Sequence, residues 1–182
     1  MKNWFVLGGF VLGLVVLVLS TPAGYGDTTT KPSPQVSALL AEAKTEAVQL
    51  RRDAEELKTF TRSNLSWQSH SAKINEIKNH VNNSGQLLTK LKNAQAGGSS
   101  QQQQTIERIE PLLKDLAASV ESTIEHLSQH SMRLRTAPYR AYVDANADIA
   151  GELADVISQS VEYEKTRAKS EDLAEKLESS GN

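Results

Sequence analysis

Four stretches of the chain repeat apolar residues at alternating steps of three and four positions. This 3.5-residue period predicts four α-helices, each with one mainly apolar seam, that pack in the left-handed manner of coiled coils. The first seam runs through Val36, Leu40, Ala43, Ala47, Leu50, Ala54, Leu57 and Thr61. The second runs through Trp67, His70, Ile74, Ile77, Val81, Ser84, Leu88, Leu91 and Gln95. The pattern therefore indicates an all-α fold.

The third and fourth seams follow the same period. The third runs through Ile106, Ile109, Leu113, Leu116, Val120, Thr123, Leu127, His130 and Leu134. The fourth is expected at Tyr142, Asn146, Ile149, Leu153, Val156, Ser160, Tyr163, Arg167, Ser170, Ala174 and Leu177. This fourth stretch is longer than the others, so we expect its end, from Lys165 to Glu178, to project or fray.

Short breaks separate the four stretches, at residues 63–66, 96–104 and 135–138. Ser33 followed by Pro34 predicts a helix start, because serine caps helices and proline is tolerated in the first turn. Short connections favour antiparallel neighbours. We therefore predict an antiparallel up-down-up-down four-helix bundle with coiled-coil-like packing over residues 35–178.

The first 34 residues have a different character. Lys2 is followed by sixteen uncharged residues, Trp4 to Leu19, and then by small residues up to Ala23. This order is typical of a secretory signal peptide, here residues 1–23, with cleavage after Ala23. An uncleaved membrane anchor is the alternative, since tilt can compensate for a short span. Residues 24–34 are expected to form a flexible leader, and the rest of the chain is expected to be periplasmic, secreted or anchored outside the cytoplasm.

Composition excludes several classes of function. The chain has no cysteine, which rules out disulfides, thiolate metal sites and covalent c-type haem. Its net charge is −2 with the signs interspersed, so there is no basic footprint for nucleic acid and no polybasic membrane patch. The sequence contains no motif of a hydrolase, a metalloprotease, a phosphate-binding loop or a di-iron protein. We therefore expect no enzymatic activity and no resident cofactor apart from the metal considered next.

Three of the four histidines are predicted to meet at one end of the bundle. Folding the second and third helices against each other about residues 98–99 brings His70 level with Leu127, between His126 and His130. One hypothesis is a divalent-metal site formed by these three histidines. The alternative is a buried polar layer that fixes the register of the helices or responds to pH.

Aromatic residues are predicted to gather at the same end. The same folding argument collects Phe60, Trp67, Tyr139 and Tyr142 there. Such a cluster serves either as the core of the bundle end or as a surface for a ligand or partner.

Two stretches of the chain carry a family resemblance. One is 74–91, with Ile74-Asn75, His80-Val81-Asn82, Gly85-Gln86-Leu87 and Lys90-Leu91, and the other is 137–153, with Ala137 to Tyr142 and Ala150 to Leu153. Both resemble a family of exported bacterial helical-bundle proteins of unknown function. The resemblance implies a bundle in the bacterial envelope and assigns no activity or functional residue.

The expected function is therefore non-enzymatic. We predict an extracytoplasmic helical bundle that binds or scaffolds an envelope protein, with homo-oligomers allowed if the seams are shared between chains. The alternative is a metal- or ligand-binding, sensor-like bundle that uses the histidine cluster.

Overall fold

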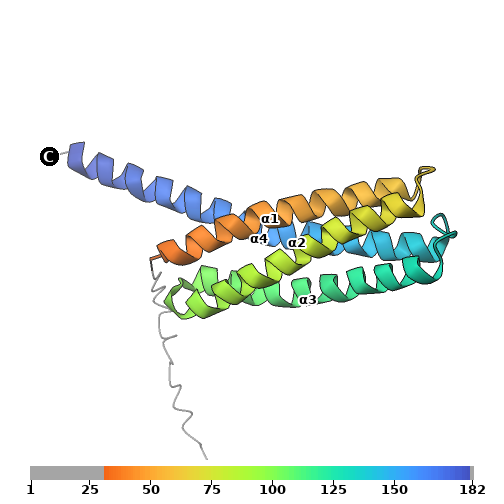
Figure 1. Cartoon of the computed structure of the whole chain (residues 1–182). Coiled ribbons are helices and arrows are strands. Elements are labelled where there is room, and N and C mark those ends of the chain that lie inside the picture. The colour runs from red at the N-terminus through yellow and green to blue at the C-terminus, as the bar shows by residue number, and fades with distance from the viewer. Residues whose placement is uncertain (1–30, 181–182) are drawn as a thin grey trace, which may run out of the picture.

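The computed structural model describes residues 31–180, so the predicted signal peptide and most of the predicted leader lie outside the described residues. Four long helices and one short 3-10 helix occupy this part of the chain (Figure 1). They are α1 (Pro34–Phe60), α2 (Trp67–Ala94), η1 (Gln95–Gly97), α3 (Ser100–Gln129) and α4 (Ala137–Ser180).

The helices form an up-down four-helix bundle. Each long helix runs against its neighbours in sequence, and α1 also packs along α4, which closes the ring (Figure 1). The loops 61–66 and 130–136 lie together at one end, which we call the loop end. η1 and the start of α1 lie at the other end. The predicted fold class is therefore confirmed.

Local sequence explains where three of the helices begin. Ser33 accepts a hydrogen bond from the backbone N–H of Val36, with Pro34 in the first turn, as predicted for α1. Ser66 caps α2 in the same way. α3 begins with a capping box, in which Ser99 and Gln102 each bond the other's backbone.

The third break is longer than predicted. The fourth helix begins at Ala137, within the predicted break at 135–138, but the predicted end of the third helix is wrong, because α3 already ends at Gln129. The last seam position predicted for that helix, Leu134, therefore lies in the loop.

The core consists largely of the predicted seams. The first seven seam residues of α1, Val36 to Leu57, are all buried. Ile74, Ile77, Val81 and Leu91 contribute from α2, and α3 is buried at every predicted seam position from Ile106 to Leu127. Burial of these apolar side chains supplies the main driving force for folding.

The seam predicted for α4 needs correction. Tyr142 and Tyr163 are exposed, and every residue from Ala168 to Ser180 is exposed as well. The buried face is wider than one seam because α4 packs against both α1 and α3. It consists of Tyr139, Val143, Asn146, Ala147, Ala150, Leu153, Ala154, Val156, Ile157, Ser160 and Val161. The small alanines on this face allow the neighbouring helices to approach closely.

Buried polar residues join the helices at several levels. Gln102 is fully buried; its Oε1 accepts from the backbone N–H groups of Ser33 and Ser99, both at 2.9 Å. Its Nε2 donates to the Ser33 carbonyl at 3.2 Å and to Ser37 Oγ at 2.9 Å. The predicted break at 96–104 is too long, because α3 already begins at Ser100 and Gln102 ties the start of α3 to the start of α1.

Two further polar pairs join α3 to α4. Thr105 Oγ1 donates to Ser160 Oγ at 2.9 Å, and Asn146 Nδ2 donates to Thr123 Oγ1 at 2.8 Å. Asn146 Oδ1 is buried without a hydrogen-bond partner.

The C-terminal part of α4 projects beyond the bundle, as the longer fourth stretch predicts (Figure 1). Within residues 31–180, no helix combines the length and apolar character required to cross a bilayer.

The two buried amides are expected to respond differently to apolar substitution. Gln102→Met removes an acceptor from two backbone N–H groups and should lower the free energy of unfolding by about 3 kcal/mol. Asn146→Val removes an acceptor that has no partner, while Thr123 keeps its bond to the Ser119 carbonyl at 2.8 Å. The Asn146→Val substitution should therefore change the free energy of unfolding by no more than about 1 kcal/mol. Urea denaturation measures both; equal losses would contradict this account.

Candidate binding surface at the loop end

The two loops at the loop end are held together by one arginine. Nε and Nη2 of Arg135 donate to the backbone carbonyl of Ser63 at 3.3 and 3.1 Å, and Nη2 also donates to Asn64 Oδ1. Ser63 follows the C-terminus of α1, where the helix dipole favours a cation. The side chain of Arg135 thus fixes the loop 130–136 against the loop 61–66.

A cluster of aromatic and imidazole rings packs beneath these loops. His70 is buried, and its ring lies 5.6 Å from Phe60 and 5.4 Å from Tyr139 between centroids. His126 lies 5.8 Å from Tyr139 and 5.3 Å from Tyr142. The structure therefore brings together five of the residues predicted to meet here.

His70 and Tyr139 form a buried hydrogen bond of 2.9 Å between Nδ1 and the phenolic oxygen. Burial lowers the pKa of His70 and raises the pKa of Tyr139, so both groups are neutral at neutral pH. We assign Tyr139 as the donor, because a protonated phenol donates to the unprotonated nitrogen of a neutral imidazole. This bond joins α2 to α4 and fits the predicted register layer.

His126 and His130 stack on each other at 4.6 Å at the end of α3. The backbone N–H of His130 closes the last turn by donating to the His126 carbonyl at 2.9 Å. His126 Nε2 is buried without a hydrogen-bond partner, and burial, followed by the neighbouring His130, lowers the pKa of His126. His126 therefore favours the neutral state.

The predicted metal site at His70, His126 and His130 stays a prediction. Within residues 31–180, no three His, Asp or Glu side chains are arranged to hold a metal ion. His70 would also have to give up Tyr139 if Nδ1 were to bind a metal.

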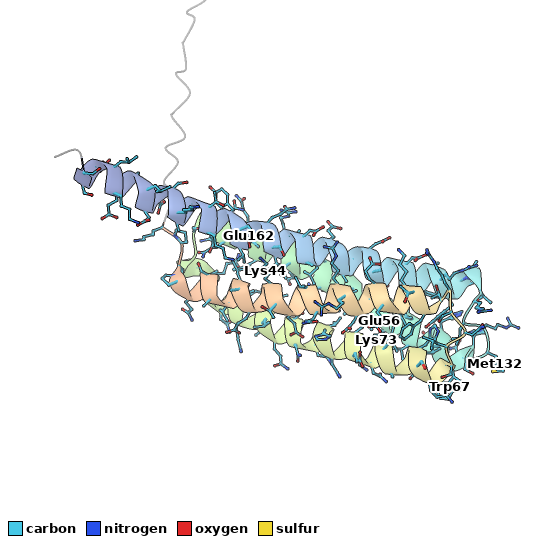
Figure 2. The ribbon with its side chains drawn as sticks, turned by 90° about the horizontal axis from the view of Figure 1, so that it is seen from above. Lys44, Glu56, Trp67, Lys73, Met132 and Glu162 are labelled. Atoms are coloured by element: carbon cyan, nitrogen blue, oxygen red, sulfur yellow. The ribbon has the colours of Figure 1, made fainter. Side chains whose placement is uncertain are left out.

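Trp67 is the one predicted aromatic that lies apart from the ring cluster. It is 45 % exposed and lines a groove of about 530 Å³ between the two loops, together with Leu65, which is 41 % exposed, and Met132, which is 91 % exposed. Figure 2 shows Trp67 and Met132 at the same end of the bundle. A smaller hollow of about 240 Å³ between α2 and α3 shares Trp67 and Ser131 with this groove. We call Leu65, Trp67 and Met132 the apolar patch.

The surroundings of the apolar patch are basic. Residues 57–72 and 126–143 contain no Asp or Glu. Arg62, Arg133 and Arg140 are exposed here, and their side chains form no ion pair within the described part of the chain. An exposed tryptophan and methionine with arginines at the rim are typical of protein-binding surfaces.

A second group of charged residues joins α1 to α2 along the flank. Lys73 Nζ lies 3.2 Å from Asp53, 2.9 Å from Glu56 and 2.5 Å from Glu76 (Figure 2). Burial acts to lower the pKa of Lys73, but its hydrogen bonds to Glu76, Glu56 and Asp53 raise the pKa above its ordinary value. The lysine is thus positively charged and serves to join the two helices.

The fourth histidine extends this charged group. His80 Nδ1 lies 2.7 Å from Glu46, and Nε2 lies 3.1 Å from Asp53. Sequence periodicity gave no sign of these contacts, because all of these residues lie outside the apolar seams.

Comparisons with protein families, curated proteins and solved structures found no match to this chain. The four-helix all-α architecture thus stands on the structure alone, and the predicted likeness to exported bacterial bundle proteins gains no support from them.

The buried histidines make stability depend on pH. The unfolded chain binds protons to His70 and His126 near pH 6.5, whereas the folded chain binds them only at lower pH because both pKa values are lowered. More protons are then bound in the unfolded state. The contribution of these two histidines to the free energy of unfolding is therefore fully present above about pH 6.5 and is lost as the pH falls below it.

The expected result is a lower unfolding midpoint in urea at about pH 5 than at about pH 7. His70→Gln retains a partner for Tyr139 without titrating, so its midpoint should change less over the same range. His126→Gln is the matched variant for the second histidine. A variant that carries both substitutions should lose most of the pH dependence. If it kept the full wild-type pH dependence, the two histidines would not be the source of that dependence.

Proposed function

We propose that this protein is a non-enzymatic helical bundle that works outside the cytoplasm and binds a partner in the cell envelope through its loop end. The observation that carries the proposal is the apolar patch of Leu65, Trp67 and Met132 around a groove that Arg133 and Arg135 also line. Exposed Trp, Met and Arg side chains of this kind contribute strongly to binding energy when a partner covers them.

The rigidity of this end supports a binding role. Arg135 fixes the two loops, and the rings of His70 and Tyr139 pack beneath them. A surface that is ordered before binding loses less conformational entropy when a partner docks. His70 is buried and already bonded to Tyr139, so it is poorly placed to act as a general base on a solute. Both points favour binding over catalysis.

The placement outside the cytoplasm rests on residues 1–23. Their charged start, apolar run and small residues before Gly24 match an export signal, and the resemblance to exported bacterial helical-bundle proteins supports the same compartment.

Export predicts a defined mature N-terminus. We expect N-terminal sequencing of the protein from producing cells to begin at Gly24, and fractionation to place it outside the cytoplasm. A retained Met1 in the membrane fraction would support the anchored form instead. An intact chain in the cytoplasm would contradict export.

The binding surface is tested by placing a photo-crosslinking amino acid at position 132 in producing cells. Because Met132 is the most exposed residue of the apolar patch, we expect discrete adducts there. The matched control is position 122, an exposed serine on the flank of α3, which should give several-fold weaker adducts. Equal yields at both positions, or none at 132, would contradict the proposed binding surface.

A further inference from the structure

The end of α4 is a second exposed surface whose purpose the bundle does not explain. Residues 168–180, which we call the tail, are all exposed and extend past the start of α1 (Figure 1). Just before the tail, α4 is joined to α1: Ser37 Oγ donates to Glu164 at 2.7 Å and Lys44 pairs with Glu162 at 2.6 Å. Thirteen exposed helical residues are marginally stable in water on their own, so the tail gains stability if another surface covers it.

The tail has an apolar stripe and an acidic character. Leu173 and Leu177 are 50 % and 72 % exposed and lie four positions apart, on one face of the helix. The tail contains four carboxylate side chains and two lysines, Lys169 and Lys176. Glu175 and Glu178 form no ion pair within the described part of the chain.

The loop end has the complementary character. It offers the apolar patch and its groove, and it carries Arg62, Arg133 and Arg140 with no Asp or Glu in the loops. An amphipathic helix can lay its leucines into such a groove while its carboxylates face the arginines at the rim.

The tail cannot reach the loop end of its own molecule. α4 starts at the loop end and runs 44 residues away from it, about 66 Å for a straight helix. The two surfaces thus lie at opposite ends of the molecule (Figures 1 and 2). Any contact between them joins two copies.

We propose that the tail of one copy docks into the loop-end groove of a second copy, so that the chains associate head to tail. Leu173 and Leu177 cover the apolar patch, and Glu175 and Glu178 face the arginines of the rim. Because the two contacting surfaces differ, each bound copy leaves a free tail and a free groove, and the assembly extends as an open chain. This inference rests on the proposed function, since it names the occupant of the same surface.

Association is measured by sedimentation equilibrium of the protein purified as the cells process it. A short helix in a groove buries a small area, so we expect weak association that becomes visible at about 0.5 mM. The average mass should rise about twofold or more between ~10 µM and ~0.5 mM. Added salt should reduce this increase, because it screens the charges at the rim.

Two variants separate the surfaces. Leu173→Gln/Leu177→Gln alters only the tail, and Leu65→Gln/Met132→Gln alters only the loop end. All four side chains are exposed, so both variants should keep the wild-type melting curve, and each alone should stay monomeric. A mixture of the two should form a 1:1 dimer and no larger species, because only one intact tail–groove contact is available. Val48→Gln, another exposed apolar position, is the matched control and should associate like the wild type.

Any of four results would overturn the proposal. The wild type could stay monomeric at every concentration, or either variant could still form a dimer alone. The mixture of the two variants could stay monomeric, or the apolar patch could bind vesicles of anionic lipid in place of a second copy. The crosslinks at position 132 keep the two proposals apart. Adducts with other proteins but none with a second copy would leave the binding function standing and remove the head-to-tail contact, whereas the absence of all adducts would remove both.

Discussion

The arrangement of the molecule depends on the wide buried face of α4. This helix lies against both α1 and α3, and Ala147, Ala150 and Ala154 let both neighbours come close. The buried face ends at Val161, although the helix continues to Ser180. Beyond this face, Glu162 and Glu164 still bond to α1, and the residues from 168 to 180 are all exposed. Both the closed ring of helices and the projecting tail follow from this one packing constraint.

Polar pairs inside the bundle add specificity to this packing. Apolar seams alone permit one helix to slide by a turn against the next, because every turn offers similar side chains. The bond between His70 and Tyr139 fixes α2 against α4, and Gln102 fixes the start of α3 against the start of α1. Each pair is satisfied in one register, and a slip would leave buried polar groups without partners. The polar layers thus select one alignment among several that the seams would allow.

The sequence predicted the features that depend on the periodicity of apolar residues. It missed the features that depend on which side chains meet in the folded chain. The 3.5-residue repeat was sufficient for four helices, and mirror geometry about the turns was sufficient to place His70 and His126 in one ring cluster, where both contact Tyr139. The same repeat misplaced the seam of α4, because a helix with two large interfaces buries more than one stripe. Gln102 was missed since a glutamine run resembles a loop when its partners are unknown. Met132 was missed because an exposed methionine in a loop carries no periodic signal.

The two ends of the bundle differ in how their residues are packed and in their charge. At the loop end, arginine bonding and ring packing hold the chain in place while Trp67 and Met132 remain exposed. At the far end, α4 extends an acidic helix whose residues 168–180 are all exposed. The first surface is ordered and basic, and the second is acidic and gains order by binding. Attraction between such ends is directional, since like ends repel each other through their charges while unlike ends attract. The opposite charges at the two ends of one chain would thus set the direction in which successive copies follow one another in any assembly.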